Sequence, residues 1–195
     1  MIRSKFIISV LLMPVAILAS TDCLAQTRQA NTIACPVDST AKAVYKGETS
    51  MAYSLFEQVD KQHDKNENVV ISPLCLADAL TILANGAKGI TLDQITSVLG
   101  TEDLNAEKVS EVYGKQNDYL AGYAREVGIK NANSVWIDNK FKVKNEFSTK
   151  NRNDFKAEIH NQKLALDMTK NAINLWCDKN SNGAIKNILS QPLSY

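Results

Sequence analysis

The segment over residues 73–85 constrains the fold more than any other, because it has the pattern of a helix with almost no polar face. Ser72 is an expected N-cap, and Pro73 suits the first helical turn, where its missing N–H group costs nothing. Apolar side chains then cover most of the helix circumference: Leu74, Cys75, Leu76, Ala77, Ala79, Leu80, Ile82, Leu83 and Ala84. Other elements must cover such a helix on most sides. We predict a central helix that ends with Gly86 in a left-handed conformation.

The rest of the pattern predicts the helices and strands that cover this helix. Apolar residues at helical spacing predict further helices from Ser50, over 91–99 with Thr91 and Gln94 as a capping box, over 106–125, near 146–153 and over 170–179. Runs rich in β-branched and aromatic residues predict strands over 69–71, 129–137 and 157–164. In the second strand, Val135 and Ile137 should face one side and Trp136 the other. We therefore expect the α+β fold class.

The N-terminal residues have the pattern of an export signal. Arg3 and Lys5 precede an apolar run over 6–19, and small residues around Ala25 provide a cleavage site. The run is shorter than a membrane-spanning helix requires. We predict a signal peptide over residues 1–25, a polar lead-in over 26–48, a folded part over 49–195, and a mature protein that is secreted, whether periplasmic or extracellular.

The charge of the mature chain argues against two classes of partner. Removing residues 1–25 takes away Arg3, Lys5 and Asp22 and leaves 20 basic and 20 acidic side chains. Nucleic acid and anionic lipid are attracted by clustered basic residues, which a balanced chain does not concentrate. We expect no nucleic-acid partner and no membrane-surface partner.

The cysteines do not form a disulfide pattern. Cys23 lies in the predicted signal, so Cys35, Cys75 and Cys177 remain, an odd number without a CxxC spacing. We interpret Cys75 and Cys177 as small packing residues inside helices. Cys35 lies well past the end of the apolar run, so we do not expect a lipid anchor there.

No constellation for catalysis or cofactor binding is found in the sequence. The two histidines are His63, in a polar turn, and His160, which shares a strand with Glu158 but has no third metal ligand nearby. The nucleophile elbow, the dinucleotide-binding glycine motif and the phosphate loop are all missing. We expect neither an enzyme nor a cofactor, and we interpret His160 as an exposed residue on the sheet.

Three segments, in order along the chain, resemble the serpin family. Residues 68–91 are similar to the serpin helix B region, with its N-V-[VI]-[IF]-S-P start and its G-A-x-G-x-T end. Residues 132–137 resemble the A-N-x-[LIV]-[FW] strand of the large central sheet, and residues 173–185 resemble the helix F signature. Together the matches span about residues 50–190. Cys75 stands where the family usually has Ser, and Ser181 where it usually has Thr.

The resemblance implies a serpin-like α+β fold, of which this chain would supply the N-terminal helical portion and part of the central sheet. It also implies a suicide substrate: a serine or cysteine protease cleaves an exposed reactive-centre loop, which then inserts into the sheet as a new strand. The serpin helix B begins in the shutter, beneath the place where the sheet opens. The resemblance assigns shutter or structural roles to seven residues: Ser72, Pro73, Cys75, Gly86, Asn133, Asn174 and Gly183.

Nothing up to Tyr195 resembles the Glu- and Ala-rich hinge of a reactive-centre loop. We therefore expect an incomplete serpin domain, truncated before the loop, inactive as an inhibitor in this form and able to self-associate through exposed strands. The alternative is a non-inhibitory binding or scaffold short form of a serpin. The predicted helix over 106–125 lacks the basic row that some serpins use for heparin, so we expect no heparin site.

Overall fold

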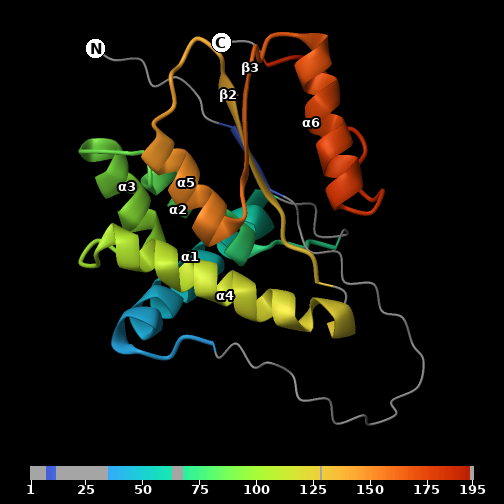
Figure 1. The fold of residues 1–195 in the computed structure, drawn as a ribbon. Helices are drawn as coiled ribbons and strands as arrows, with labels where there is room; N and C mark the ends of the chain where they lie inside the picture. The colour runs from blue at the N-terminus through green and yellow to red at the C-terminus, as the bar shows by residue number, and fades with distance from the viewer. Residues whose placement is uncertain (1–7, 12–34, 63–67, 128, 194–195) are drawn as a thin grey trace.

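The computed structural model describes residues 8–11, 35–62, 68–127 and 129–193. Helices predominate, and α6 lies across the sheet from α5 and α2 (Figure 1). The elements in chain order are β1 (Ile8–Leu11), α1 (Ser39–Gln62), α2 (Pro73–Ala84), α3 (Ile90–Leu99), α4 (Ala106–Val127), β2 (Asn133–Asp138), α5 (Asn145–Phe155), β3 (Glu158–Gln162) and α6 (Asp167–Asn180). The expected α+β class is confirmed.

The three strands form one sheet in the order β1-β2-β3, with β2 at its centre. β1 pairs antiparallel with β2 and places Ile8 opposite Trp136, whereas β3 pairs parallel with β2 and places His160 opposite Trp136. The sequence predicted β2 and β3 but not β1, which falls inside the predicted export signal. The remainder of that signal, apart from residues 8–11, lies outside the described residues, as does His63.

Both faces of β2 are buried. Its apolar side chains pack into the core, and its polar side chains, those of Asn133, Ser134 and Asp138, form hydrogen bonds. Val135 and Ile137 pack into the larger apolar cluster with side chains of α1, α2, α4 and α5. Trp136 faces the opposite side and packs with Ile173 and Trp176 of α6. The predicted alternation of faces along this strand is therefore confirmed.

The central helix has the start predicted for it but not the end. Ser72 is its N-cap, and Pro73 is the first helical residue. Gly86 was predicted to stop the helix in a left-handed conformation, and this is wrong: Asn85 is the C-cap with φ −60°, and Gly86 is not among the residues with positive φ. Gly86 is required for space instead, because a Cβ there would lie 2.9 Å from the Phe147 ring.

Other boundaries also differ from the predictions. α1 begins at Ser39 rather than Ser50, because its early buried face consists of the small residues Ala41, Val44 and Gly47, which give a weak hydrophobic signal. Residues 69–71 are not a strand, since none of the described strands pairs with them. The Thr91 capping box is also wrong: Gly89, with φ 56°, is the N-cap of α3. α3 ends at Gly100, which has a left-handed φ of 63°.

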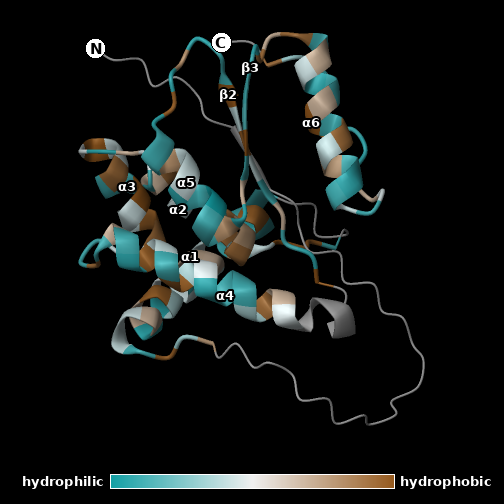
Figure 2. Cartoon of the chain, viewed as in Figure 1, coloured by the Kyte–Doolittle hydropathy of each residue, from teal (hydrophilic) through white to brown (hydrophobic). Residues whose placement is uncertain are grey.

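The outer helices are amphipathic. Figure 2 shows polar and apolar positions interleaved along α4 and α6, consistent with one face on the core and one in solvent. Within the described ranges, no helix has both the length and the apolar character needed to span a membrane.

Candidate functional site

The start of α2 holds three of the residues to which the resemblance gave a role, and one of them, Cys75, is buried. The Ser72 hydroxyl oxygen accepts a hydrogen bond from the Cys75 backbone N–H at 3.4 Å, which satisfies a donor that the first helical turn cannot pair internally. Cys75 is only 2% exposed, and burial raises the pKa of its thiol. The thiol therefore stays protonated at neutral pH and acts as a packing group, as predicted.

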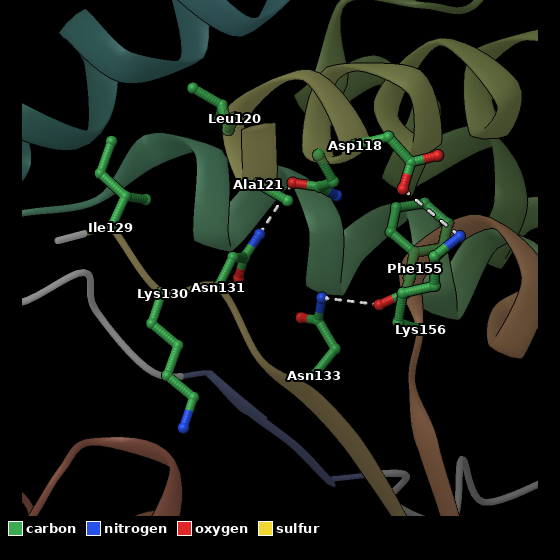
Figure 3. A pocket seen from close by; sticks show the side chains of 10 residues that line it. Asp118, Leu120, Ala121, Ile129, Lys130, Asn131, Asn133, Phe155 and Lys156 are labelled. Carbon is green, nitrogen blue, oxygen red and sulfur yellow. Dashed lines mark hydrogen bonds and ion pairs between the residues drawn. The ribbon is translucent and has the colours of Figure 1, made fainter. Parts of the chain in front are cut away.

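One turn further along α2, Asp78 is fully buried, and side-chain amide groups donate hydrogen bonds to it. Figure 3 shows two of these donors, Asn131 and Asn133, where the chain enters β2. Asn117 of α4 donates to both carboxylate oxygens, at 3.0 Å and 2.9 Å. Asn131 donates to Asp78 Oδ2 at 2.8 Å, and Asn133 donates to the same oxygen at 3.5 Å. We call these four residues the Asp78 cluster. It joins α2, α4 and the start of β2.

Burial controls the electrostatics of the Asp78 cluster. It raises the pKa of Asp78 from its usual 3.8 to about 6, although the three amide donors act in the opposite direction by stabilising the carboxylate. Glu48 of α1 raises the pKa further through its negative charge. Burial also raises the pKa of Glu48 itself.

The structure brings some of the predicted site residues together and separates others. Asn133 bonds to Asp78, one turn from Cys75, so these residues share one buried region. Asn174 belongs to α6 and forms paired bonds with the backbone of Leu189, its Nδ2 donating to the carbonyl and its Oδ1 accepting from the N–H, both at 2.9 Å. Gly183, with φ 84°, turns the chain after α6. Asn174 and Gly183 thus lie across the sheet from α2.

Asp78, Asn117 and Asn131 were not predicted as site residues from the sequence. A signal for Asp78 was present, because it is the one charged residue in an otherwise apolar helix, and a buried acid requires polar partners. Asn117 and Asn131 carried no such signal. They lie 39 and 53 residues from Asp78 in the chain, and polar residues at those positions are ordinary for a surface helix and a loop.

The strand predictions also missed one aromatic contact. His160 was expected to be exposed on the sheet, but its side chain is 27% exposed and its ring stacks on Trp136 with centroids 4.0 Å apart. Its Nε2 lies 3.4 Å from Glu158 Oε2. Across the described ranges, no three His, Cys, Asp or Glu side chains converge in a group that could hold a metal ion.

The chemistry of the Asp78 cluster is that of positioning and binding. It contains a carboxylate and three amides but no nucleophile paired with a base. The hydrogen bond from Asn133 to Asp78 holds β2 against the central helix α2. Asn133 also donates to the Phe155 carbonyl at 3.4 Å, which links the start of β2 to the end of α5.

Comparison with known proteins places these features in a family context. A family model described as Serpin (serine protease inhibitor) matches residues 46–194. Glia-derived nexin of Rattus norvegicus is 32% identical over 140 residues, which cover 71% of this chain and 34% of the nexin. Neuroserpin of Homo sapiens is 30% identical over 128 residues, which cover 65% of this chain and 31% of neuroserpin.

Solved structures show the same likeness in three dimensions. The crystal structure of mouse protein-Z dependent protease inhibitor aligns with a TM-score of 0.69 at 20% identity, covering 80% of this chain and 44% of that one. The thermophilic serpin tengpin in its latent state aligns with a TM-score of 0.61 at 27% identity, covering 81% of this chain and 41% of that one. The present chain spans about a third of the length of the curated relatives that it matches.

Proposed function

This chain belongs to the serpin family, and we propose that it supplies the N-terminal part of a protease inhibitor that acts as a suicide substrate on serine or cysteine proteases. The observation that carries the proposal is the match of residues 46–194 to the family model. The relatives named above include a mouse protease inhibitor, and serpins inhibit proteases rather than catalyse a reaction of their own.

The arrangement of α2 and β2 supports a shutter role for the start of α2. In the serpin mechanism the central sheet opens to admit the cleaved loop as a strand, so contacts between helix B and the sheet must hold the sheet closed and then permit its rearrangement. Here a hydrogen bond between Asn133 and Asp78 joins β2 to α2, and Ser72 and Cys75 lie at the adjoining helix end. We propose that these contacts govern sheet opening.

The test is a search for a covalent complex. The complete product of the gene is incubated with trypsin-like, chymotrypsin-like, elastase-like and papain-like proteases and then analysed by denaturing electrophoresis. An SDS-stable complex with at least one protease is expected, and none should form when the active-site nucleophile of that protease has been blocked beforehand. Cleavage of the product by all of the proteases without any trapped complex would support the non-inhibitory alternative.

We propose that residues 1–195 alone do not trap a protease, because the mechanism needs a reactive-centre loop and a sheet that can accept it. The three strands of the described residues form a small sheet, and no segment among them resembles the loop hinge. The same electrophoretic assay applies. An SDS-stable complex formed by the 195-residue chain would overturn this part of the proposal.

We further propose that the protein is exported. Arg3 and Lys5 ahead of the apolar run over 6–19 support this. Expression of the gene in a secreting host should yield a processed protein outside the cytoplasm whose N-terminal residue is Gln26. Recovery of an unprocessed N-terminus in the cytoplasm alone would contradict the export proposal.

A further inference from the structure

A cavity of about 770 Å³ lies between the end of α2, the end of β2 and the first turns of α5. The connection from β2 to α5, residues 139–144, supplies part of its wall and can be followed in Figure 1. Sites for small organic ligands commonly have volumes of this order. The cavity is open to solvent, and its lining combines an apolar floor with a charged rim.

The floor of the cavity is built from side chains of the larger apolar cluster. Ile137 of β2 and Phe147 of α5 are buried members of that cluster. Phe141 and Val143, in the connection, pack against the cluster and remain partly exposed. A hydrocarbon chain that lies on this floor leaves water for carbon surface, which is favourable in proportion to the apolar area that it buries.

Three lysines on the rim of the cavity are exposed and free. Lys88 lies in the turn after α2, and Lys142 and Lys144 alternate with the apolar residues of the connection. Among the residues that the structure describes, none of the three lysine side chains takes part in a hydrogen bond or an ion pair. Lysine can lay its carbon stem along apolar surface while its ammonium group stays in water. A negative group at the rim therefore meets accessible, unengaged cations.

The two other charged residues of the lining limit how much negative charge the site accepts. Lys150 Nζ lies 3.1 Å from Asp154 Oδ2, so the charge of this lysine is already balanced. Glu146 is an exposed acid on the same rim. It repels a doubly charged head group more strongly than a singly charged one. The rim therefore favours a carboxylate over a phosphate monoester.

We propose that this cavity binds a free long-chain carboxylate, whose hydrocarbon chain lies on the apolar floor and whose head group lies among the three free lysines of the rim. The floor selects the chain and the lysines select the sign of the head group, so the ligand must have both. The balanced charge of the whole chain conceals this local excess of positive charge. The binding does not require the inhibitory mechanism, so its test is independent of the search for a covalent complex.

A ligand series tests the proposal by isothermal titration calorimetry of the complete gene product at pH 7.5. Decanoate, kept below its micellar concentration, should bind in a saturable way. Octanoate should bind more weakly by about fourfold for each of the methylene groups that it lacks. Decyltrimethylammonium has the same chain length but the opposite charge, and it should bind more weakly than decanoate. No saturable binding of decanoate, or equal binding of the anion and the cation, would overturn the proposal.

Methyl NMR spectra of the same protein, labelled with 13C on the valine and isoleucine methyl groups, locate the ligand. Decanoate should shift the methyl signals of Ile137 and Val143 along the same saturation curve that calorimetry gives. Ile173 packs under α6 on the other face of the sheet, so its methyl signals should stay in place. Saturable binding that leaves Ile137 and Val143 unshifted would place the ligand elsewhere and would overturn the assignment to this cavity.

A matched pair of double variants tests the part played by the rim lysines. Lys142→Gln with Lys144→Gln removes two exposed charges, and the affinity for decanoate should fall at least about fivefold, the effect of roughly one exposed ion pair. Lys108→Gln with Lys115→Gln removes two exposed charges from α4 instead and should leave the affinity unchanged. Added salt should weaken binding to the parent protein more than binding to the rim variant, because it screens exposed charges. A rim variant that binds decanoate as tightly as the parent would contradict the proposal.

Discussion

Asn85 Nδ2 donates a hydrogen bond to Asn151 Oδ1 at 2.8 Å, which ties the end of α2 to a fully buried residue of α5 that lies 66 positions further along the chain. The same Asn85 amide donates to the Ser110 hydroxyl at 3.1 Å. Ser110 in turn donates to Asp154 at 2.7 Å, and Lys150 lies 3.1 Å from the same carboxylate. Three helices, α2, α4 and α5, are therefore joined by one continuous polar network.

Removing the buried amide of this network should destabilise the fold. Asn151→Ala removes one of the two acceptors of the Asn85 amide, which keeps its bond to Ser110, and removes the side-chain donor of the Ile82 carbonyl. An unpaired buried group typically costs about 1–3 kcal/mol. Urea unfolding should show a lower free energy of unfolding by that order. Asn153→Ala, an exposed position on the same helix, is the control and should change it by less than about 0.5 kcal/mol. Equal effects of the two substitutions would contradict the assignment.

The buried carboxylate predicts a specific pH dependence of stability. The pKa of Asp78 is about 6 in the folded protein and close to its usual 3.8 once the chain unfolds. Between these values the folded state binds more protons than the unfolded state, so stability from this group is present below pH 3.8 and is lost as the pH rises through 6. A pKa difference of this size corresponds to about 3 kcal/mol.

Asp78→Asn isolates that contribution. Because the amide does not titrate, the free energy of unfolding of the variant should vary less between pH 4 and pH 7 than that of the parent protein. Urea titrations at several pH values give the difference directly. A parent and a variant whose stabilities change in parallel across this range would show that Asp78 does not titrate with a raised pKa.

Two helical glycines should respond to alanine in opposite directions. A Cβ on Gly47 of α1 would lie 2.9 Å from the Gly100 carbonyl oxygen, so Gly47→Ala should force α1 away from α3 and cost about 1–3 kcal/mol. Gly122 in α4 has nothing within 4 Å of such a Cβ, so Gly122→Ala should stabilise by about 0.5–1 kcal/mol. Thermal unfolding of the two variants tests both signs, and a stabilised Gly47→Ala protein would contradict the close packing of α1 on α3.

The elements with strong local signals could be predicted from the sequence. Ser72 and Pro73 mark the start of α2 because an N-cap and a first-turn proline are local chemistry. The two faces of β2 followed from the alternation of Val135, Trp136 and Ile137. These features depend on residues within a few positions of one another.

The features that depend on distant contacts could not be predicted. Residues 69–71 have strand-forming side chains, but a strand also needs a pairing partner, which no local pattern supplies. Gly86 looked like a helix stop, yet its real constraint is the Phe147 ring, 61 positions away in sequence. The Asp78 cluster shows the same limit, since the acid is visible in the sequence and its amide partners are not.

β1 occupies one edge of β2 in the sheet. Ile8–Leu11 pairs with Asn133–Trp136, and these four residues lie within the predicted export signal, so cleavage after Ala25 would leave the backbone of β2 unpaired along that edge. An open edge pairs readily with another chain, and two remaining strands are marginal by themselves. Residues 26–195 expressed alone should therefore be helix-rich and should self-associate. Size-exclusion chromatography together with near-UV circular dichroism of Trp136 and Trp176 is the measurement, and a monodisperse monomer with a sharp thermal transition would show that this part of the chain is stable without β1.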